Sequence, residues 1–316
     1  MAVAVGRNLE GVGSITDALV ENGYFMGPNP FSAADRNALH GLFQSVLGVY
    51  DLPELERRTR KFDASYEAGW AGYHYTGPDP AMGHPGKHSF TVRSRTRLSG
   101  LWHRIQESDD PYDRPLARLY GKSFELMDLA RPVMLGVLAR LDAELPGRSI
   151  LAKHAQPAYG NPSKHIVSDD VRIVIYEASE PGAELSEPHL DRSSLTMLAS
   201  PGGTFVDHNG SRVILDNTAS PDEIVYYPGQ RLMHPYVCPG VGFVATRHGA
   251  VSTTQPGPRA VITYQTHPLG AWPMGSGFGP EDDYAAATRQ IEHDRLKGPR
   301  RTDDSAHWPS RYDWCI

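Results

Sequence analysis

The sequence predicts a mainly β fold with flanking helices, whose strands form a sandwich or a barrel of the jelly-roll kind. The main observation is a series of short β-rich segments that begins at Val171 and is interrupted by turn residues, as in jelly rolls and related β architectures. The first 150 residues instead have mainly helical patterns, and no linker separates them from the β-rich part. The predicted strands cover residues 171–176, 195–198, 204–207, 212–215, 223–227, 242–248 and 260–266.

Two helices are predicted near the N-terminus, because two serines each stand three residues before an acid. Ser14 precedes Asp17 and Ser32 precedes Asp35, the spacing at which a serine hydroxyl caps a helix N-terminus. The second serine opens a run with leucines at helical spacing. Between the two helices, residues 24–27 are aromatic and bounded by Gly and Pro, which indicates a strand of the main sheet.

The middle of the helical half is less regular. Residues 64–99 are rich in Gly, Pro, His and aromatics, and they are expected to form loops with a short strand around 89–92. Residues 123–145 return to a helical pattern, which Pro132 is expected to kink or divide. A polar helix is expected at 280–296.

One domain is therefore predicted over residues 1–316. It would consist of a mainly helical part at 1–150, a jelly-roll core at 151–270 that carries the functional site, and a C-terminal helix and tail at 271–316. A chain of 316 residues is long for one average domain, but single β domains with helical additions reach this size.

Composition excludes several classes of function. The formal net charge of -6 argues against nucleic-acid binding, which requires clustered Lys and Arg. No apolar run approaches the length needed to span a bilayer, and no basic segment leads into an apolar stretch at the N-terminus, so a cytoplasmic location is expected. With Cys238 and Cys315 as its only cysteines, the chain has no disulfide framework and no thiolate zinc ribbon. The oligomeric state stays open.

The most informative residues are His189 and Asp191, followed by His248. One intervening residue places His189 and Asp191 on the same face of a β-strand, and His248 is expected to close a strand. Two imidazoles and one carboxylate are the ligands that hold non-haem Fe(II) and leave positions open for oxygen and a co-substrate. His234 is a rival third ligand, but it precedes a proline in a turn-rich segment, which favours a loop.

Arg259 follows His248 by 11 residues and is predicted on a neighbouring strand. A planar guanidinium binds a carboxylate through two parallel hydrogen bonds, which a lysine cannot reproduce. Arg259 is therefore the candidate clamp for a carboxylate of the co-substrate. The alternative for Arg259 is a surface arginine in a salt bridge.

These motifs resemble those of the isopenicillin N synthase-like Fe(II)/2-oxoglutarate-dependent oxygenases. The order and approximate spacing agree, and the resemblance extends over most of the chain. It is carried by Tyr176, the segment Glu187-Pro-His-Leu-Asp-Arg-Ser-Ser-Leu-Thr-Met-Leu198, the segment Ala245-Thr-Arg-His-Gly-Ala-Val251 and the segment Arg259-Ala-Val-Ile-Thr-Tyr264, with looser similarity at residues 18–25 and 87–90.

The resemblance implies a double-stranded β-helix, a cupin-like jelly roll flanked by helices. It implies iron at His189, Asp191 and His248, and 2-oxoglutarate bound by Arg259 and Tyr176. The expected reaction uses O2 to oxidise an unactivated C–H bond of a small molecule, by hydroxylation, desaturation or cyclisation, in the biosynthesis of specialised metabolites.

One position departs from the family pattern. Two residues after the arginine the family normally has a serine that shares the co-substrate carboxylate, and here that position is Val261. Tyr176 or Thr263 are candidates to supply the missing hydrogen-bond donor. The departure keeps open a second interpretation, an oxidase like isopenicillin N synthase itself, which uses no 2-oxoglutarate.

The substrate pocket is expected to include aromatic side chains. The candidates are Tyr73, Tyr75, Phe90 and Phe205, for which core packing is the competing interpretation. Arg172 alternates with apolar neighbours on a strand and faces either the pocket or solvent. Two other classes of protein also stay open, a non-catalytic jelly-roll binding protein and a zinc hydrolase, because zinc with three protein ligands activates water.

Overall fold

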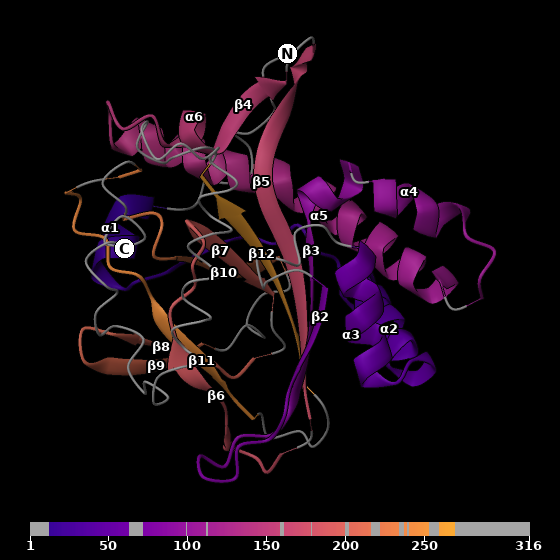
Figure 1. Cartoon of the computed structure of the whole chain (residues 1–316). Coiled ribbons are helices and arrows are strands. Elements are labelled where there is room, and N and C mark those ends of the chain that lie inside the picture. The colour runs from indigo at the N-terminus through magenta and orange to yellow at the C-terminus, as the bar shows by residue number, and fades with distance from the viewer. Residues whose placement is uncertain are drawn as a thin grey trace, which may run out of the picture.

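The structure is a computed structural model. It shows two antiparallel β-sheets, with helices against the outer face of the larger one (Figure 1). The residues that it describes are 13–62, 72–98, 100–111, 113–158, 161–177, 179–199, 202–215, 222–233, 237–238, 240–252 and 259–268. The expected C-terminal helix at 280–296 and the rival ligand His234 lie outside these residues. Within the described part of the chain, no helix is long and apolar enough to cross a membrane.

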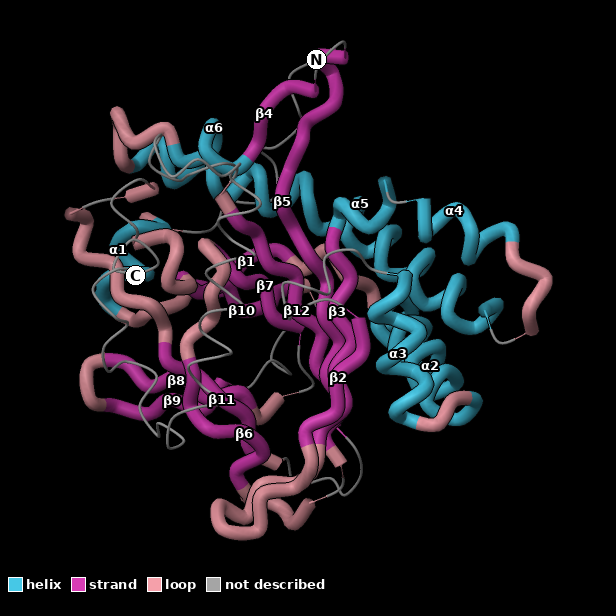
Figure 2. Tube along the Cα trace, in the orientation of Figure 1, coloured by secondary structure: helices cyan, strands magenta, loops and turns pink. Residues whose placement is uncertain are grey.

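The helices come mainly from the first half of the chain (Figure 2). Their bounds are α1 Ile15–Glu21, α2 Ala33–Val49, α3 Leu52–Phe62, α4 Gly100–Glu107, α5 Asp113–Glu144 and α6 Ile150–His154, and a short 3-10 helix covers Ser94–Leu98.

The strands form two sheets. The larger sheet has the order β1-β10-β7-β12-β5-β3-β2, with β4 paired to β5, and the smaller has the order β6-β11-β8-β9. The bounds are β1 Phe25–Pro28, β2 Gly72–Thr76, β3 Lys87–Arg93, β4 Ala155–Ala158, β5 Asn161–Tyr176, β6 Glu184–His189, β7 Leu195–Ala199, β8 Thr204–His208, β9 Ser211–Leu215, β10 Glu223–Pro228, β11 Arg247–Val251 and β12 Arg259–His267.

Both serine caps form as the sequence predicts. The Ser14 hydroxyl accepts from the Asp17 backbone N–H at 3.1 Å, and Ser32 and Asp35 form a reciprocal capping box. The start of α1 is also tied to the end of α5, because the Glu144 carboxylate accepts from the first backbone N–H groups of α1. An anion at this position stabilises a helix N-terminus.

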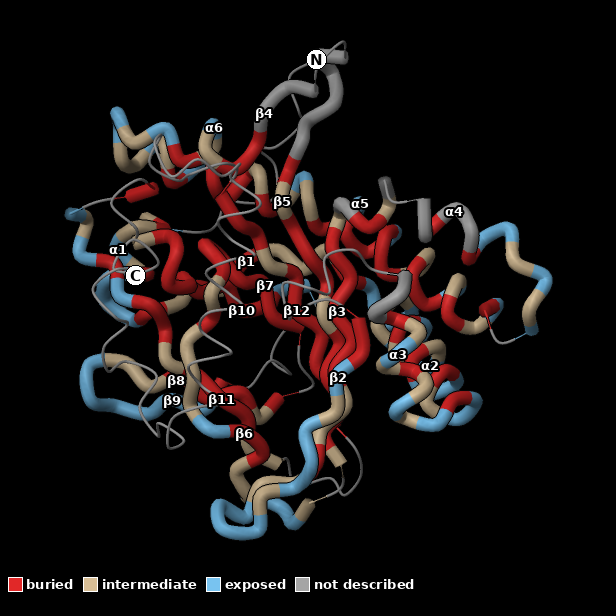
Figure 3. Tube along the Cα trace, in the orientation of Figure 1, coloured by how far each residue is buried: buried red, intermediate tan, exposed pale blue. Residues whose placement is uncertain are grey.

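The two faces of the larger sheet bury different sets of side chains. On β5, Val171, Ile173 and Ile175 pack into the cluster shared with the helices, whereas Val174 and Tyr176 pack into a second cluster between the sheets. This alternation follows from the two-residue period of a strand. The larger sheet is buried along most of its length, whereas β9 at the edge of the smaller sheet is mostly exposed (Figure 3), and the site lies between the sheets.

A buried ion pair fixes the long helix to the larger sheet. The Arg131 guanidinium on α5 donates to the two Asp169 carboxylate oxygens at 2.8 and 3.2 Å. The Tyr264 hydroxyl on β12 donates to the same carboxylate at 2.6 Å. Asp169 is 2% exposed, so these three hydrogen bonds compensate for the loss of water around its carboxylate.

Several elements differ from those expected from the sequence. Residues 64–99, expected mainly as loops, include the hairpin of β2 and β3, which pairs with β5 at the sheet edge. Pro132 does not divide the helix, since α5 runs from Asp113 to Glu144 through it. Buried α5 side chains on both sides of the proline pack against the sheet, and this packing offsets a cost of about 3 kcal/mol.

The strand expected at 242–248 also begins later. Gly242 has a φ of 82°, a left-handed conformation that a strand does not accommodate. The β-structure starts at Arg247, so His248 lies near the beginning of β11 instead of closing it.

Candidate active site

His189 and His248 stand opposite each other on paired strands of the smaller sheet. His189 is the last residue of β6 and His248 is the second residue of β11, and the antiparallel register pairs them directly. Their ring centroids are 4.4 Å apart. Strand pairing therefore brings together two imidazoles that are 59 positions apart in the sequence.

Asp191 reaches the same place from a turn. β6 ends at His189, so the expectation that His189 and Asp191 share one face of a strand is wrong. The turn is held by backbone hydrogen bonds from Gln230 to the Asp191 carbonyl at 2.8 Å and from Arg231 to the Ser193 carbonyl at 3.1 Å. These bonds, and not strand geometry, place the carboxylate beside the imidazoles.

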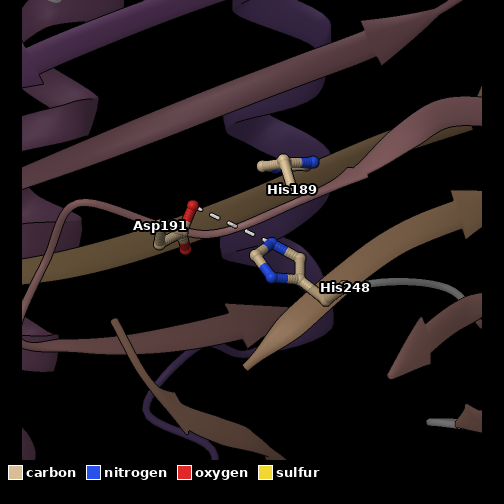
Figure 4. A group of neighbouring side chains, drawn as sticks. All are labelled: His189, Asp191 and His248. Carbon is tan, nitrogen blue, oxygen red and sulfur yellow. Dashed lines mark ion pairs between the residues drawn. The ribbon is translucent and has the colours of Figure 1, made fainter. Parts of the chain in front are cut away.

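The three side chains form one cluster (Figure 4). One ligand atom from each of His189, Asp191 and His248 lies within 4.8 Å of the others, and His248 Nε2 is 3.8 Å from Asp191 Oδ1. This spacing allows one metal ion to contact all three. Among the described residues, no other group of three or more His, Cys, Asp or Glu side chains is close enough together to hold a metal.

Hydrogen bonds to the backbone orient both imidazoles. His189 Nδ1 lies 2.9 Å from the Glu187 carbonyl, and His248 Nδ1 lies 3.0 Å from the Thr246 carbonyl. A carbonyl only accepts, so each Nδ1 must carry a proton, which leaves Nε2 as the ring nitrogen that can bind a metal. Metal-binding histidines are commonly fixed by such a bond.

Burial and mutual charge set the protonation of the cluster. Burial, with a smaller effect of His248, lowers the pKa of His189 to about 3, so this imidazole is neutral near pH 7. Burial alone would raise the pKa of Asp191, but His248, His189 and two hydroxyl groups oppose it, and the net shift is downward. A neutral His189 and an ionised Asp191 are the states in which these two side chains bind a metal cation.

Two hydroxyl groups hold the carboxylate from behind. Thr196 Oγ1 on β7 and the Tyr227 hydroxyl on β10 donate to Asp191 Oδ2 at 2.6 and 2.9 Å. Oδ1 is therefore the oxygen left for a metal. Neither residue is among those predicted from the sequence to form the site. The segment after Asp191 shows a run of hydroxyl residues, but nothing in the sequence places Tyr227 here.

A pocket opens from this cluster between the two sheets. It encloses about 530 Å³, including its open mouth. The metal-binding candidates and Arg259 belong to the same pocket. Its other lining residues are Lys87, Arg172, Val174, Tyr176, Ser186, Leu198, Thr204, Tyr227, Gly249, Ala250, Val261, Thr263 and Gln265.

Arg259 is buried at the start of β12, with 6% of its surface exposed. Its guanidinium donates to the carbonyls of Gly203 and Val251 at 3.2 and 3.1 Å. Burial lowers the pKa of Arg259 to about 10, so the group is still cationic at neutral pH. The alternative of an exposed arginine in a surface salt bridge is wrong.

Thr204 supplies a hydroxyl beside Arg259. The arginine donates to Thr204 Oγ1 at 3.0 Å, and Thr204 lines the pocket and is buried. Val261, on the same face of β12, offers no polar group. Tyr176 is aligned with Arg259 across β5 and β12, whereas Thr263 lies four residues further along β12. Thr204 was not foreseen from the sequence, because it comes from a different sheet.

The four aromatic candidates for substrate binding do not line the pocket. Tyr73 and Phe90 face the helices and pack with Phe43, because they lie on the sheet face opposite to the pocket. The Tyr75 hydroxyl donates to Glu177 at 3.0 Å. Phe205 alternates with the pocket-lining Thr204 and lies on the other face of the smaller sheet, where it is fully buried beneath the Arg212 guanidinium, 3.8 Å from its ring centroid. The competing interpretation, core packing, accounts for Tyr73 and Phe90.

Cys238 has no role in this site. It is buried and unpaired, and burial raises the pKa of its thiol. A buried thiol with a raised pKa is a poor nucleophile.

No protein-family model and no curated protein matches the sequence. Solved structures do match the fold. A full-length protein of Neurospora crassa, solved in complex with alpha-KG, covers 90% of this chain and 91% of its own at 15% identity, with a TM-score of 0.61. The dioxygenase for auxin oxidation of rice covers 89% and 88% at 16% identity, with a TM-score of 0.56.

A third similar structure is JOX2 in complex with 2OG, Fe and JA, which covers 81% of this chain and 70% of its own at 12% identity, with a TM-score of 0.52. At these identities the comparisons establish the fold. The matches extend over a wider group of oxygenases and do not single out the isopenicillin N synthase-like branch. The predicted jelly roll with flanking helices is therefore confirmed, and the chain has the fold of iron- and 2-oxoglutarate-binding oxygenases.

Proposed function

We propose that the chain is a non-haem Fe(II)- and 2-oxoglutarate-dependent oxygenase that oxidises a C–H bond of a small molecule. The observation that carries the proposal is a single pocket that contains both the His189, Asp191 and His248 cluster and the buried cation Arg259. The fold shared with the Neurospora crassa protein and JOX2, solved with alpha-KG or 2OG, supports the same interpretation.

The residues fit iron by their donor chemistry. Two imidazoles, each hydrogen-bonded through Nδ1 to a backbone carbonyl, and one carboxylate are the facial set that suits non-haem Fe(II). A structural zinc site would ordinarily take four protein ligands, and none of the described cysteines lies in the pocket. When bound, iron supplies the activation of O2 that allows a C–H bond to be oxidised.

The chain's own residues bind and orient the co-substrate. Arg259 would hold the carboxylate of 2-oxoglutarate that is remote from the metal, through two charge-assisted hydrogen bonds. Thr204 lies where its hydroxyl can share that carboxylate. Val174, Leu198 and Val261 give this stretch of the pocket an apolar surface, which excludes water and strengthens the ionic contacts.

A small organic substrate is part of the proposal. The Neurospora crassa protein has been solved with thymine and JOX2 with JA, and the pocket here combines apolar side chains with a few polar groups, as small-molecule sites do.

The proposal is tested by anaerobic addition of Fe(II) and then 2-oxoglutarate to the purified chain. We expect a weak visible charge-transfer band from the wild-type protein, no band from His189→Ala, and at least tenfold weaker 2-oxoglutarate binding by Arg259→Gln. The matched control is Arg97→Gln, a surface arginine paired with Asp128, which should keep the wild-type band.

The outcomes separate the competing functions. Iron binding that persists in His189→Ala would contradict the assigned site. Iron binding without any 2-oxoglutarate binding would favour the oxidase that uses no co-substrate. Binding of neither metal nor co-substrate would leave a non-catalytic jelly roll. Activity with zinc in hydrolysis, and none with iron, would indicate the hydrolase.

A further inference from the structure

A second arginine, Arg172, enters the pocket and has no task in the proposed function. It belongs to β5, where Arg172, Val174 and Tyr176 alternate toward the space between the sheets, and it lines the pocket. Its Nε is buried without a hydrogen-bond partner among the described residues. A buried donor left unsatisfied costs about 1–3 kcal/mol, so this position requires an explanation.

The residues next to Arg172 show the same feature. Thr263 is directly opposite Arg172 in the register of β12 and β5. Its Oγ1 is buried without a partner in the described structure. The Ser186 hydroxyl on the facing sheet is likewise without a partner, but Ser186 pairs with Ala250 and so lies nearer to Thr204. Both residues line the pocket. Thr263 is 8% exposed and Ser186 is 4% exposed. Unsatisfied polar groups such as Arg172 Nε and Thr263 Oγ1, on paired residues of one pocket wall, indicate a bound ligand.

This place is separate from the proposed co-substrate clamp. Thr263 and Arg259 are four residues apart on β12, which corresponds to about 13 Å along a strand. The Arg259 guanidinium turns toward Thr204 and the Val251 carbonyl on the smaller sheet. Further along the strands, β7 and β10 carry Thr196 and Tyr227, which hold the metal-binding carboxylate. The Arg172 and Thr263 pair lies at a strand position between these two ends.

The charge of the pocket also favours an anion. Lys87, Arg172 and Arg259 line it, whereas Asp191 is its one acidic lining residue among those the structure describes. A divalent metal and a dianionic co-substrate would cancel each other, so the excess of cationic side chains would persist.

We propose that the substrate carries a carboxylate and that Arg172 and Thr263 bind it. The inference rests on the proposed function, since it assigns Arg259 to the co-substrate. A planar guanidinium matches a carboxylate through two parallel hydrogen bonds, and the Thr263 hydroxyl adds a third donor. The bound acid would then lie beside the His189, Asp191 and His248 cluster, and the C–H bonds of the acid would face that cluster.

The probes are monocarboxylates, namely the straight-chain acids from butanoate to decanoate, benzoate and phenylacetate. Each acid is compared with its own primary amide. Phenyl phosphate is included as a different anion. They are added anaerobically to the Fe(II) protein with saturating 2-oxoglutarate, which occupies Arg259. Binding is read from the perturbation of the charge-transfer band. We expect at least one acid to bind tenfold or more tightly than its amide. Arg172→Gln should lose this preference and Thr263→Val should weaken it about fivefold, both with 2-oxoglutarate affinity within twofold of wild type.

Several results would overturn the inference. The inference is wrong if the wild-type protein binds every acid and its amide equally, or if it binds phenyl phosphate more tightly than all the acids. It is also wrong if Arg172→Gln still binds acids more tightly than amides. If Arg172→Gln loses 2-oxoglutarate while Arg259→Gln keeps it, Arg172 is the co-substrate clamp. Folding of each variant is checked by circular dichroism, and Arg172→Lys, which keeps the charge, should retain part of the preference.

Failure of the proposed function has a different signature. The wild-type protein would then show no charge-transfer band with Fe(II) and 2-oxoglutarate. The preference for acids over amides can still be measured in the metal-free protein by thermal shift, with Arg259→Gln present to remove the other anion site.

Discussion

The Tyr227 hydroxyl donates to Asp191 Oδ2 at 2.9 Å, and its oxygen also lies 3.0 Å from His248 Nε2. Tyr227 thus contacts two of the three candidate ligands from β10, a strand of the opposite sheet. A metal on His248 Nε2 would leave Asp191 as the acceptor for this hydroxyl. Tyr227 and Thr196 together would then keep Oδ2 occupied and Oδ1 turned toward the metal.

Replacing Tyr227 with Phe should weaken Fe(II) binding by about 10- to 100-fold, as is typical when a hydrogen-bond partner of a metal ligand is removed. The ring would still fill its buried place. The measurement is anaerobic titration with Fe(II), followed by isothermal calorimetry. Tyr226→Phe is the matched control, because Tyr226 is equally buried on the same strand but donates to the Pro28 carbonyl. Equal Fe(II) affinities in the two variants would contradict the role of Tyr227.

Replacing Thr204 with Val should raise the dissociation constant of 2-oxoglutarate about tenfold. The change removes the hydroxyl beside Arg259 and keeps the side-chain shape, and a hydrogen bond to a charged group contributes about 1.5–3 kcal/mol. Fe(II) affinity should not change. Val261→Ser, introduced into the Thr204→Val protein, should recover part of the loss because it adds a hydroxyl on the same pocket wall. Unaltered 2-oxoglutarate affinity in Thr204→Val would show that Arg259 acts without this partner.

The sequence was sufficient to nominate His189, Asp191, His248 and Arg259, because their residue types and spacing indicate a chemistry, and the structure brings them into one pocket. It was not sufficient for how they meet. Asp191 is placed by backbone bonds from Gln230, 39 residues further along, and Thr204 reaches Arg259 across a separation of 55 residues. Such contacts depend on which strands become neighbours, and one sequence does not encode that in any local pattern.

The aromatic residues illustrate the opposite error. Tyr73 and Phe90 lie in a segment rich in Gly, Pro and His, which resembled a binding loop. They are instead paired residues of β2 and β3 on the face covered by helices. Local composition indicated neither the hairpin nor its orientation, since one residue of register decides which face a side chain takes.

Replacing Gly229 with Ala should disrupt the turn that holds Asp191. A Cβ on Gly229 would lie 2.2 Å from the Ser193 carbonyl oxygen, so the backbone must move. We expect a loss of unfolding free energy of about 2 kcal/mol or more and weaker Fe(II) binding. Gly41→Ala is the control, because its Cβ meets nothing within 4 Å and alanine favours a helix by about 1 kcal/mol. A Gly229→Ala protein with normal stability would show that the turn is not rigid.

Replacing Asp169 with Asn should destabilise the fold by about 3 kcal/mol, since it leaves the Arg131 guanidinium without its buried counter-charge. The matched control is Asp128→Asn. Asp128 also pairs with Arg131, at 3.3 Å, but its side chain is 50% exposed, so the expected loss is below about 1 kcal/mol. Urea denaturation measures both. Similar losses in the two variants would contradict the difference in burial as the cause.

Stability should fall in mild acid because of His154, which is fully buried and lies far from the metal cluster in the sequence. Burial lowers the pKa of His154 from 6.5 to about 4, so the unfolded chain binds a proton between these pH values that the folded protein excludes. The unfolding free energy contributed by this group is complete above pH 6.5 and decreases as the pH falls toward 4. Between pH 7 and pH 5 the decrease is about 2 kcal/mol.

His154→Asn keeps a donor for the Ile150 carbonyl, which His154 Nδ1 contacts at 2.7 Å, and cannot take up the proton. Urea denaturation at both pH values should therefore show a smaller decrease for His154→Asn than for the wild-type protein. Other histidines, such as the buried His267, titrate in both proteins and largely cancel in the comparison. Equal decreases in the two proteins would show that His154 is not the group responsible.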